Sequence, residues 1–263
     1  MNLELSGRNF LITAASKGLG FSVARELLRE GARVMLSSSN SANLDAAAGK
    51  LKEEGLTNFE LAVCDLADAA SIDKLVDKTF DKFGVIDGLV TNCGGPPAGP
   101  PLAISDQQWQ RAFDTIFMSV VRLCRRIVPQ MIERRQGSVL AITSTTVKQP
   151  IVNLTTSNSI RPGLVGYLRY LANEVAPHNV RVNVVAPGRI LTARTQELDD
   201  AYAARTGMSL EEVRAHYTTE IPMGRLGDLD EFPPLCAFLL SPRASYITAQ
   251  TYCVDGGRVQ SLW

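Results

Sequence analysis

Short apolar segments alternate with amphipathic helical segments along most of the chain, and this alternation limits the fold more than any other feature. The pattern predicts strands over 8–13, 33–36, 59–63, 86–91, 138–143, 180–185 and 251–254. It predicts helices over about 19–28, 42–52, 71–83, 105–131, 163–175 and 232–240. Strands that are apolar almost throughout are typical of parallel sheets covered by helices on both faces.

This order predicts one fold class. Right-handed crossovers would give a doubly wound α/β sheet of Rossmann type, with ligands at the carboxyl ends of the strands. We see no internal repeat or linker, so residues 1–263 are expected to form a single domain. Residues 193–220 interrupt the alternation, and Ser209 with Glu212 forms a capping-box pattern there. An insertion beside strand ends is often a lid, and a surface decoration is the alternative.

Composition limits which partners the protein can bind and indicates the cellular compartment in which it works. The 27 basic and 27 acidic residues cancel, which argues against nucleic acid or an acidic membrane as a partner. With only two histidines, no metal site is expected. Five scattered cysteines without a CxxC motif indicate reduced thiols in a cytoplasmic protein. The N-terminus lacks a signal-peptide pattern, and no run of about 18 apolar residues predicts a membrane span.

A glycine-containing turn, TAASKGLG, runs from Thr13 to Gly20 between the first strand and the first helix. Glycines at such a turn let the backbone approach a pyrophosphate on the helix N-terminus. Gly18 and Gly20 alone are weak support, because any tight turn favours glycine. The wider pattern resembles the short-chain dehydrogenase/reductase family, whose signature is T-G-x-x-x-G-x-G. Ala14 replaces the first glycine, and we expect binding to survive with strain if this position needs a positive φ.

The resemblance continues to the C-terminal region. Asp65-Leu66 matches the acidic position beside the adenine, TNCG (91–94) matches the N-N-A-G motif, and RVNVVAPGRILT (181–192) matches a strand and its P-G loop. The segment from Pro222 to Gly257 is also similar. The resemblance implies cofactor contacts at Thr13, Ser16, Lys17, Gly18, Leu19, Gly20, Ser38, Ser39, Asp65, Leu66, Asn92, Gly94, Arg161, Pro187, Gly188, Ile190 and Thr192.

The end of the second strand bears on the choice between NAD(H) and NADP(H). An NAD site usually places a carboxylate on the adenosine ribose there, but this strand ends in serines. Ser38 and Ser39 can donate hydrogen bonds to a 2′-phosphate, and Lys17 lies where a basic residue favours NADP(H) in similar proteins. A serine run is also ordinary loop, and Lys17 could be a solvated charge. The residues favour NADP(H).

The catalytic positions depart from the family pattern of an Asn, a Ser and a Tyr-x-x-x-Lys pair. The tyrosine position falls on Ser157, the lysine on Arg161, and the asparagine on Ile116, so only the serine, Ser144, is retained. A serine hydroxyl is too weak an acid to replace a phenol, and arginine does not titrate in proteins. We take Ser144, Arg161 and Ser157 as the catalytic candidates, with most of the activity expected from Ser144 and Arg161. In the structural alternative, Ser157 and Arg161 only form the start of a helix, with Ser157 near the N-terminal cap and Arg161 just before Pro162.

Other proton donors are conceivable. Lys148 follows the strand of Ser144, while Tyr202 and Tyr217 lie in the candidate lid, although each could be a surface residue. Tyr167 and Tyr170 lie further along the helix of Arg161 and are better explained as core or subunit contacts.

Three functions are open. The pattern S-N-x-x-R resembles a divergent branch often labelled 3-oxoacyl carrier-protein reductase, which implies an oxidoreductase for a carbonyl or secondary alcohol, with a 3-oxoacyl-type thioester as one option. A catalytically silent NADP-binding scaffold or redox sensor is the second hypothesis, and a lyase or isomerase is the third. Similar proteins form homotetramers through the two long helices, here 105–131 and 154–175. Weak support comes from apolar residues that could exceed the needs of one core, namely Phe117, Val120, Val121, Leu164 and Leu168.

Overall fold

The computed structural model describes residues 1–261, in which seven parallel strands form one sheet. The strand order is β3-β2-β1-β4-β5-β6-β7, so the direction of winding reverses between β1 and β4 and leaves a crevice at their carboxyl ends. The predicted doubly wound sheet is confirmed. The strands are β1 (Asn9–Ile12), β2 (Arg33–Ser38), β3 (Phe59–Val63), β4 (Gly88–Thr91), β5 (Gly137–Ile142), β6 (Val180–Pro187) and β7 (Thr251–Val254).

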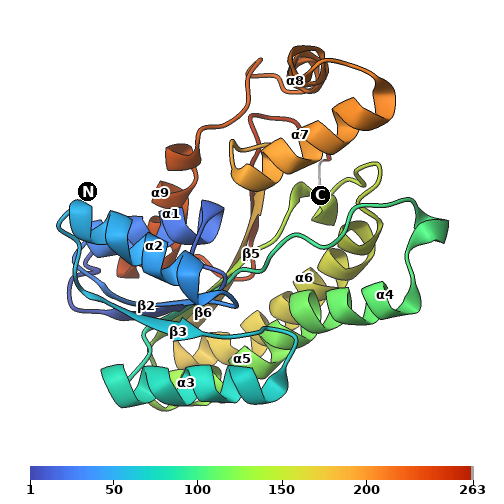
Figure 1. Cartoon of the computed structure of the whole chain (residues 1–263). Helices are drawn as coiled ribbons and strands as arrows, with labels where there is room; N and C mark the ends of the chain where they lie inside the picture. The colour runs from blue at the N-terminus through green and yellow to red at the C-terminus, as the bar shows by residue number, and fades with distance from the viewer. Residues whose placement is uncertain (262–263) are drawn as a thin grey trace.

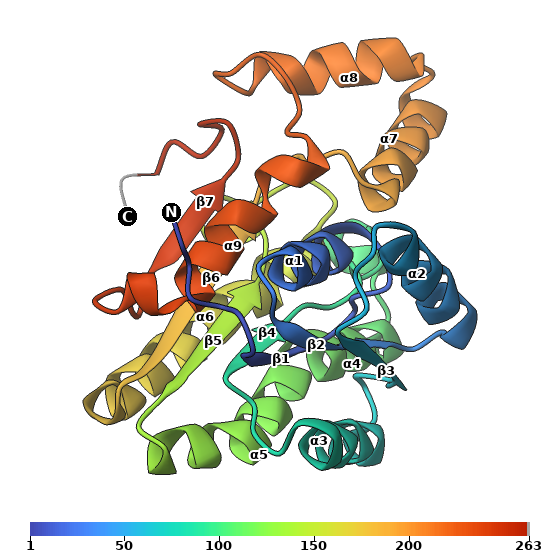
Figure 2. The same ribbon diagram turned by 90° about the vertical axis from the view of Figure 1, so that its left-hand side faces the viewer.

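Helices cover both faces of the sheet, as Figures 1 and 2 show. One face carries α1 (Gly18–Arg29), α2 (Ser41–Glu53) and α9 (Pro233–Leu240), and the other carries α3 (Ala69–Phe83), α5 (Ser119–Glu133) and α6 (Thr155–Val175). Each face has its own buried apolar cluster. Burial of each large side chain contributes about 1.5–3 kcal/mol, so the two clusters fix the strand ends rigidly.

The helix expected over 105–131 is interrupted. It begins with α4 (Asp106–Phe113) at the predicted capping box of Ser105 and Gln108, and it then widens into a π-helical turn at Asp114–Met118 before α5. No local sequence pattern predicts this π-helical turn. Ile116, at the position of the family's asparagine, is buried in the core within it. The turn therefore supplies packing in place of a polar side chain.

Helix α6 begins at Thr155, well before the start near Gly163 that the apolar pattern predicts but next to the start of the long helix, 154–175, that the family resemblance implies, and it contains Pro162. Proline removes a helix hydrogen bond and usually ends or kinks a helix, so the start taken from the apolar pattern was wrong. Tertiary contacts stabilise the first turns: the Asn158 side chain exchanges two hydrogen bonds with the backbone of Ile151, at 3.0 and 2.8 Å. Arg161 consequently lies inside the helix, with its side chain fixed by the packing around it.

The insertion forms a pair of helices, α7 (Ala193–Thr206) and α8 (Leu210–Thr219), that stands beyond the carboxyl edge of the sheet (Figures 1 and 2). The Ser209–Glu212 capping box starts α8, as predicted. Within residues 1–261, no helix is long and apolar enough to cross a membrane.

Candidate functional site

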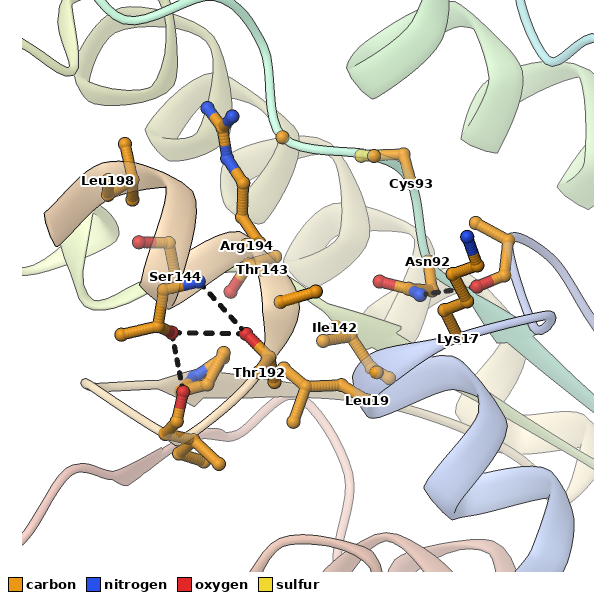
Figure 3. Close-up of a pocket in the computed structure, with 18 of the residues that line it drawn as sticks. Lys17, Leu19, Asn92, Cys93, Ile142, Thr143, Ser144, Thr192, Arg194 and Leu198 are labelled. Atoms are coloured by element: carbon orange, nitrogen blue, oxygen red, sulfur yellow. Dashed lines mark hydrogen bonds between the residues drawn. The ribbon is translucent and has the colours of Figure 1, made fainter. Parts of the chain in front are cut away.

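A cleft of about 620 Å³ follows the carboxyl ends of β1, β4, β5 and β6. Figure 3 shows Lys17 and Asn92 toward one end and Ser144 and Leu198 toward the other. All but three of the residues predicted from the sequence line this cleft, and the exceptions are Thr13, Gly20 and Ser157. The lining residues among the predictions are Ser16, Lys17, Gly18, Leu19, Ser38, Ser39, Asp65, Leu66, Asn92, Gly94, Ser144, Arg161, Pro187, Gly188, Ile190 and Thr192.

The turn before α1 has the backbone expected of an anion site. Ala14 adopts φ +46° and Gly18 φ +56°. The left-handed backbone of the alanine is strained, as anticipated for this position, at a cost of order 1 kcal/mol or more. Helix α1 begins after Lys17 with no side chain capping it, in contrast to the capped helices α2, α3 and α4. Its first-turn N–H groups and the positive end of its dipole are therefore left for a bound anion.

Thr13 and Gly20 support the cleft from behind. The Thr13 hydroxyl donates to the carbonyl of Asn92 at 2.7 Å and accepts from its N–H at 2.9 Å, while the Asn92 side chain donates to the Ala14 carbonyl at 3.1 Å. A Cβ at Gly20 would lie 2.4 Å from that same carbonyl oxygen. Thr13 and Gly20 thus lock the glycine turn to the end of β4.

The end of β2 carries hydroxyls and no carboxylate. Ser16 donates its hydroxyl to Ser38 at 2.9 Å, and Lys17 and Ser39 are exposed beside them. The nearest lining acid toward this end, Asp65, accepts from the N–H of Ala67 and from Arg111, at 3.0 and 3.3 Å. Arg111 is an unpredicted lining residue, and it comes from α4, with no local pattern linking it to Asp65.

Ser144, Ser157 and Arg161 come together around the end of β5. Ser144 is half-buried, and its Oγ accepts from the N–H of Thr146 at 3.2 Å, which leaves its own proton free to donate. Ser157 is buried, shares a hydrogen bond of 3.0 Å with the Thr146 hydroxyl and accepts from Arg161 Nε at 3.1 Å. Ser157 therefore orients Arg161 and does not face the cleft.

Arg161 is buried, with only 6% of the residue exposed. It donates to the carbonyl of Ile142 at 3.4 Å and to the Cys93 sulfur at 3.6 Å. In the described residues 1–261 no carboxylate pairs with it. Cys93 also lines the cleft, a role that the cysteine count alone did not reveal. The positive charge at this point is thus available to a bound molecule.

The other conceivable proton donors lie outside the cleft lining. Lys148 is half-buried elsewhere, and Tyr202 and Tyr217 line a second cavity under the insertion. Burial raises the pKa of the Tyr217 phenol above its ordinary value, with Arg189 acting in the opposite direction. Tyr167 packs against the core, as one of the two roles considered for it predicts, and Tyr170 is 66% exposed, so that a subunit contact of Tyr170 stays a prediction.

Comparisons with known proteins agree with this geometry. A family model described as enoyl-(acyl carrier protein) reductase matches residues 13–258. Dehydrogenase/reductase SDR family member 4 of Caenorhabditis elegans is 34% identical over 97% of this chain and 96% of its own. The 3-oxoacyl-[acyl-carrier-protein] reductase of Escherichia coli is 32% identical over 98% of both chains.

A solved structure extends the likeness to three dimensions. L-sorbose reductase from Gluconobacter frateurii, complexed with NADPH and L-sorbose, superposes with a TM-score of 0.94 at 30% identity over 100% of both chains. Fold, cleft and sequence therefore lead to one assignment: the chain belongs to the short-chain dehydrogenase/reductase family.

Proposed function

We propose that this protein is an NADP(H)-dependent oxidoreductase that interconverts a carbonyl and a secondary alcohol without a catalytic tyrosine. The observation that carries the proposal is the buried Arg161 guanidinium, which lines the cleft and meets no carboxylate among residues 1–261. A buried charge without a partner is costly, so a ligand that brings oxygen atoms or negative charge to this point stabilises it.

The cleft fits a dinucleotide with a 2′-phosphate. The uncapped start of α1 offers N–H groups to the pyrophosphate. Lys17, Ser38 and Ser39 would hold the 2′-phosphate, because they supply one cation and two hydroxyls where no carboxylate lies. Arg161 would hold the ribose beside the nicotinamide, and the loop from Pro187 to Thr192 would border the ring. The NADPH complex of L-sorbose reductase supports this choice of cofactor.

NADPH supplies a hydride when it is bound. The residues of the chain orient the carbonyl and stabilise the negative charge that develops on its oxygen. Ser144 can donate its free hydroxyl proton as a hydrogen bond, and Arg161 adds a fixed positive charge. Since neither group loses a proton near neutral pH, the proton for the alcohol would come from water or from a side chain of the lid.

The relatives suggest which carbonyl compounds to test first. The Escherichia coli relative is named for 3-oxoacyl groups on a carrier protein, so a 3-oxoacyl-type thioester belongs in the set beside simple ketones. A cytoplasmic location belongs to the same proposal, because all five cysteines are unpaired, as expected where thiols stay reduced.

The proposal is tested in two steps. NADPH binding is first measured from its fluorescence, and the protein with NADPH is then offered a set of carbonyl compounds while NADPH absorbance is followed. Turnover of at least one compound, lost in Arg161→Ala, is the expected result. Failure to bind NADPH at micromolar protein would refute the proposal.

A silent NADP-binding protein is the second candidate. It is favoured by Ser157, whose hydroxyl is occupied inside the fold and cannot act on a substrate. NADPH binding without turnover of any carbonyl compound in the set would support this candidate over the enzyme.

A further inference from the structure

A second cavity, of about 870 Å³, opens beside the cofactor cleft, and its chemistry indicates what the substrate carries. The cavity and the cleft share Ile151, Leu154, Arg189, Leu198 and Arg258, so they meet where the segments that follow β5, β6 and β7 and helix α7 come together. A molecule whose carbonyl reaches Ser144 can therefore extend its far end into this second cavity.

Aromatic rings from both insertion helices, with Arg205 of α7 and Arg189 of the loop after β6, form one wall of the cavity. Tyr202 of α7 stacks on His216 of α8 with ring centroids 5.9 Å apart, and it meets Tyr217 edge-on at 5.5 Å. Arg189 lies over the Tyr217 ring at 3.4 Å, and Arg205 lies over the Tyr202 ring at 4.9 Å. This wall is therefore aromatic, with positive charge lying over its rings.

The charges of this wall do not cancel. Arg189 is paired with the buried Asp199, and Arg258 is paired with Glu220. Arg205 also lines the cavity and is exposed, and it has neither a hydrogen bond nor an ion pair within residues 1–261. Its guanidinium lies over the Tyr202 ring. One positive charge is thus left over at the end of the cavity that the insertion forms.

We propose that the substrate carries a carboxylate remote from its reacting carbonyl, and that Arg205 binds this carboxylate while Tyr202 and Tyr217 pack against the connecting atoms. A single uncompensated charge matches a carboxylate, whereas a phosphate monoester would bring nearly two negative charges at neutral pH. The planar guanidinium suits bidentate recognition of a carboxylate. This inference rests on the proposed function, because it names the substrate class of that site.

Binding is the primary measurement, so that the test does not depend on turnover. Oxo acids whose carbonyl and carboxylate are separated by two to eight methylene groups, beginning with 4-oxo-4-phenylbutanoate, are titrated into the protein with NADP⁺ by calorimetry, and each is compared with its neutral methyl ester. Acids are expected to bind about 3- to 10-fold more tightly than their esters, because Arg205 is exposed and solvent screens its charge. Arg205→Gln should abolish this preference and leave the affinity for the esters unchanged.

Arg214→Gln is the matched control, because it removes an exposed arginine from α8 that does not line the cavity. It should leave the preference for acids intact. If no acid in the set binds more tightly than its ester, or if Arg205→Gln keeps the preference, the inference is overturned. If acids bind with this preference but none is reduced, the carboxylate site stands and the oxidoreductase proposal fails.

Discussion

Ser144 and Arg161 differ from a tyrosine–lysine pair in that neither side chain changes protonation in the neutral range. They can stabilise negative charge on a substrate oxygen through a hydrogen bond and a fixed charge, yet they cannot deliver a proton. Ser157 acts one step further away, because its hydroxyl accepts from Arg161 Nε and thereby holds the guanidinium in place. The activity should therefore divide unequally among these three residues.

We predict that Ser144→Ala lowers kcat about 10- to 1000-fold, the range for the loss of one electrostatic donor. Arg161→Ala should weaken NADPH binding as well as turnover, since the guanidinium serves both. The pH dependence of kcat should lack a titration near the pKa of a lysine-activated phenol. Steady-state kinetics across pH, together with NADPH titrations of each variant, measure these effects.

Ser157→Ala serves as the contrast. It should keep turnover within a few-fold but reduce the free energy of unfolding by about 1–3 kcal/mol, because Thr146 and Arg161 each lose a buried partner. Full turnover in both Ser144→Ala and Arg161→Ala would place the chemistry elsewhere in the cleft.

Lys17 carries a second prediction, on cofactor choice. Lys17→Ala should raise the Kd for NADPH about 3- to 10-fold and leave the Kd for NADH nearly unchanged, because only NADPH carries the 2′-phosphate. The modest size follows from the exposure of Lys17, since solvent screens exposed charges. Lys50→Ala, an exposed lysine of α2 outside the cleft, is the control. Fluorescence titration that finds the same loss for both cofactors would contradict the assignment.

At the residue scale, the cleft could be predicted from the sequence. Most residues that line the cleft directly follow strands, and the ends of strands can be recognised from apolar runs. The sequence could not separate lining from supporting residues. Thr13, Gly20 and Ser157 occupy family positions, but their contacts are made with Asn92, Ala14 and Arg161 inside the protein. Arg111 donates to Asp65, which is far from it in the sequence, so this contact could be found only from the fold.

At the scale of elements, helix starts with capping boxes were predictable, whereas the π turn and the early start of α6 were not. Ser105 and Ser209 cap through local hydrogen bonds that a four-residue pattern encodes. Pro162 inside α6 violates local preference, and the long-range packing that tolerates it leaves no local pattern.

The insertion of α7 and α8 is the element for which we predict motion. Few of its side chains are buried, and its ties to the rest of the chain include the ion pairs Arg189–Asp199 and Arg258–Glu220, the contact of Arg189 with the Tyr217 ring, and a hydrogen bond of 2.9 Å from Arg194 to the Pro96 carbonyl. Segments with so few buried side chains open at low free-energy cost and can close over a ligand to exclude water. Residues 193–220 should therefore act as a lid.

Hydrogen exchange tests this prediction. Amide exchange in residues 193–220 should slow when NADPH and a bound carbonyl compound are present together, while exchange in α3, on the far side of the sheet, should not change. Unchanged exchange in the insertion would reduce it to a surface decoration.

At the scale of the whole molecule, the residues first considered for a subunit contact need correction. Val120, Leu164 and Leu168 are buried in the chain's own core, and so they do not exceed its needs. The exposed apolar surface of the same helices is aromatic instead. Phe113 is 40% exposed and stacks on Phe117 at 5.1 Å, and Phe117 contacts Tyr167 at 6.0 Å. We call Phe113, Phe117, Tyr167 and the exposed Tyr170 the aromatic face.

We predict that the protein is a homotetramer that buries the aromatic face between subunits, because exposed aromatic clusters of this kind are typical of interfaces. Light scattering at micromolar concentration should then give a mass about four times the 28.5 kDa of one chain. Phe113→Asp combined with Tyr170→Asp should reduce the mass without unfolding the chain, since both side chains are substantially exposed. Val63→Asp is the control, because it alters an apolar residue on β3 whose exposure, 58%, lies between those of Phe113 and Tyr170, away from α4 and α6. A monomeric mass for the unaltered protein would refute the prediction, and a tetramer that survives the double substitution would move the interface to another face.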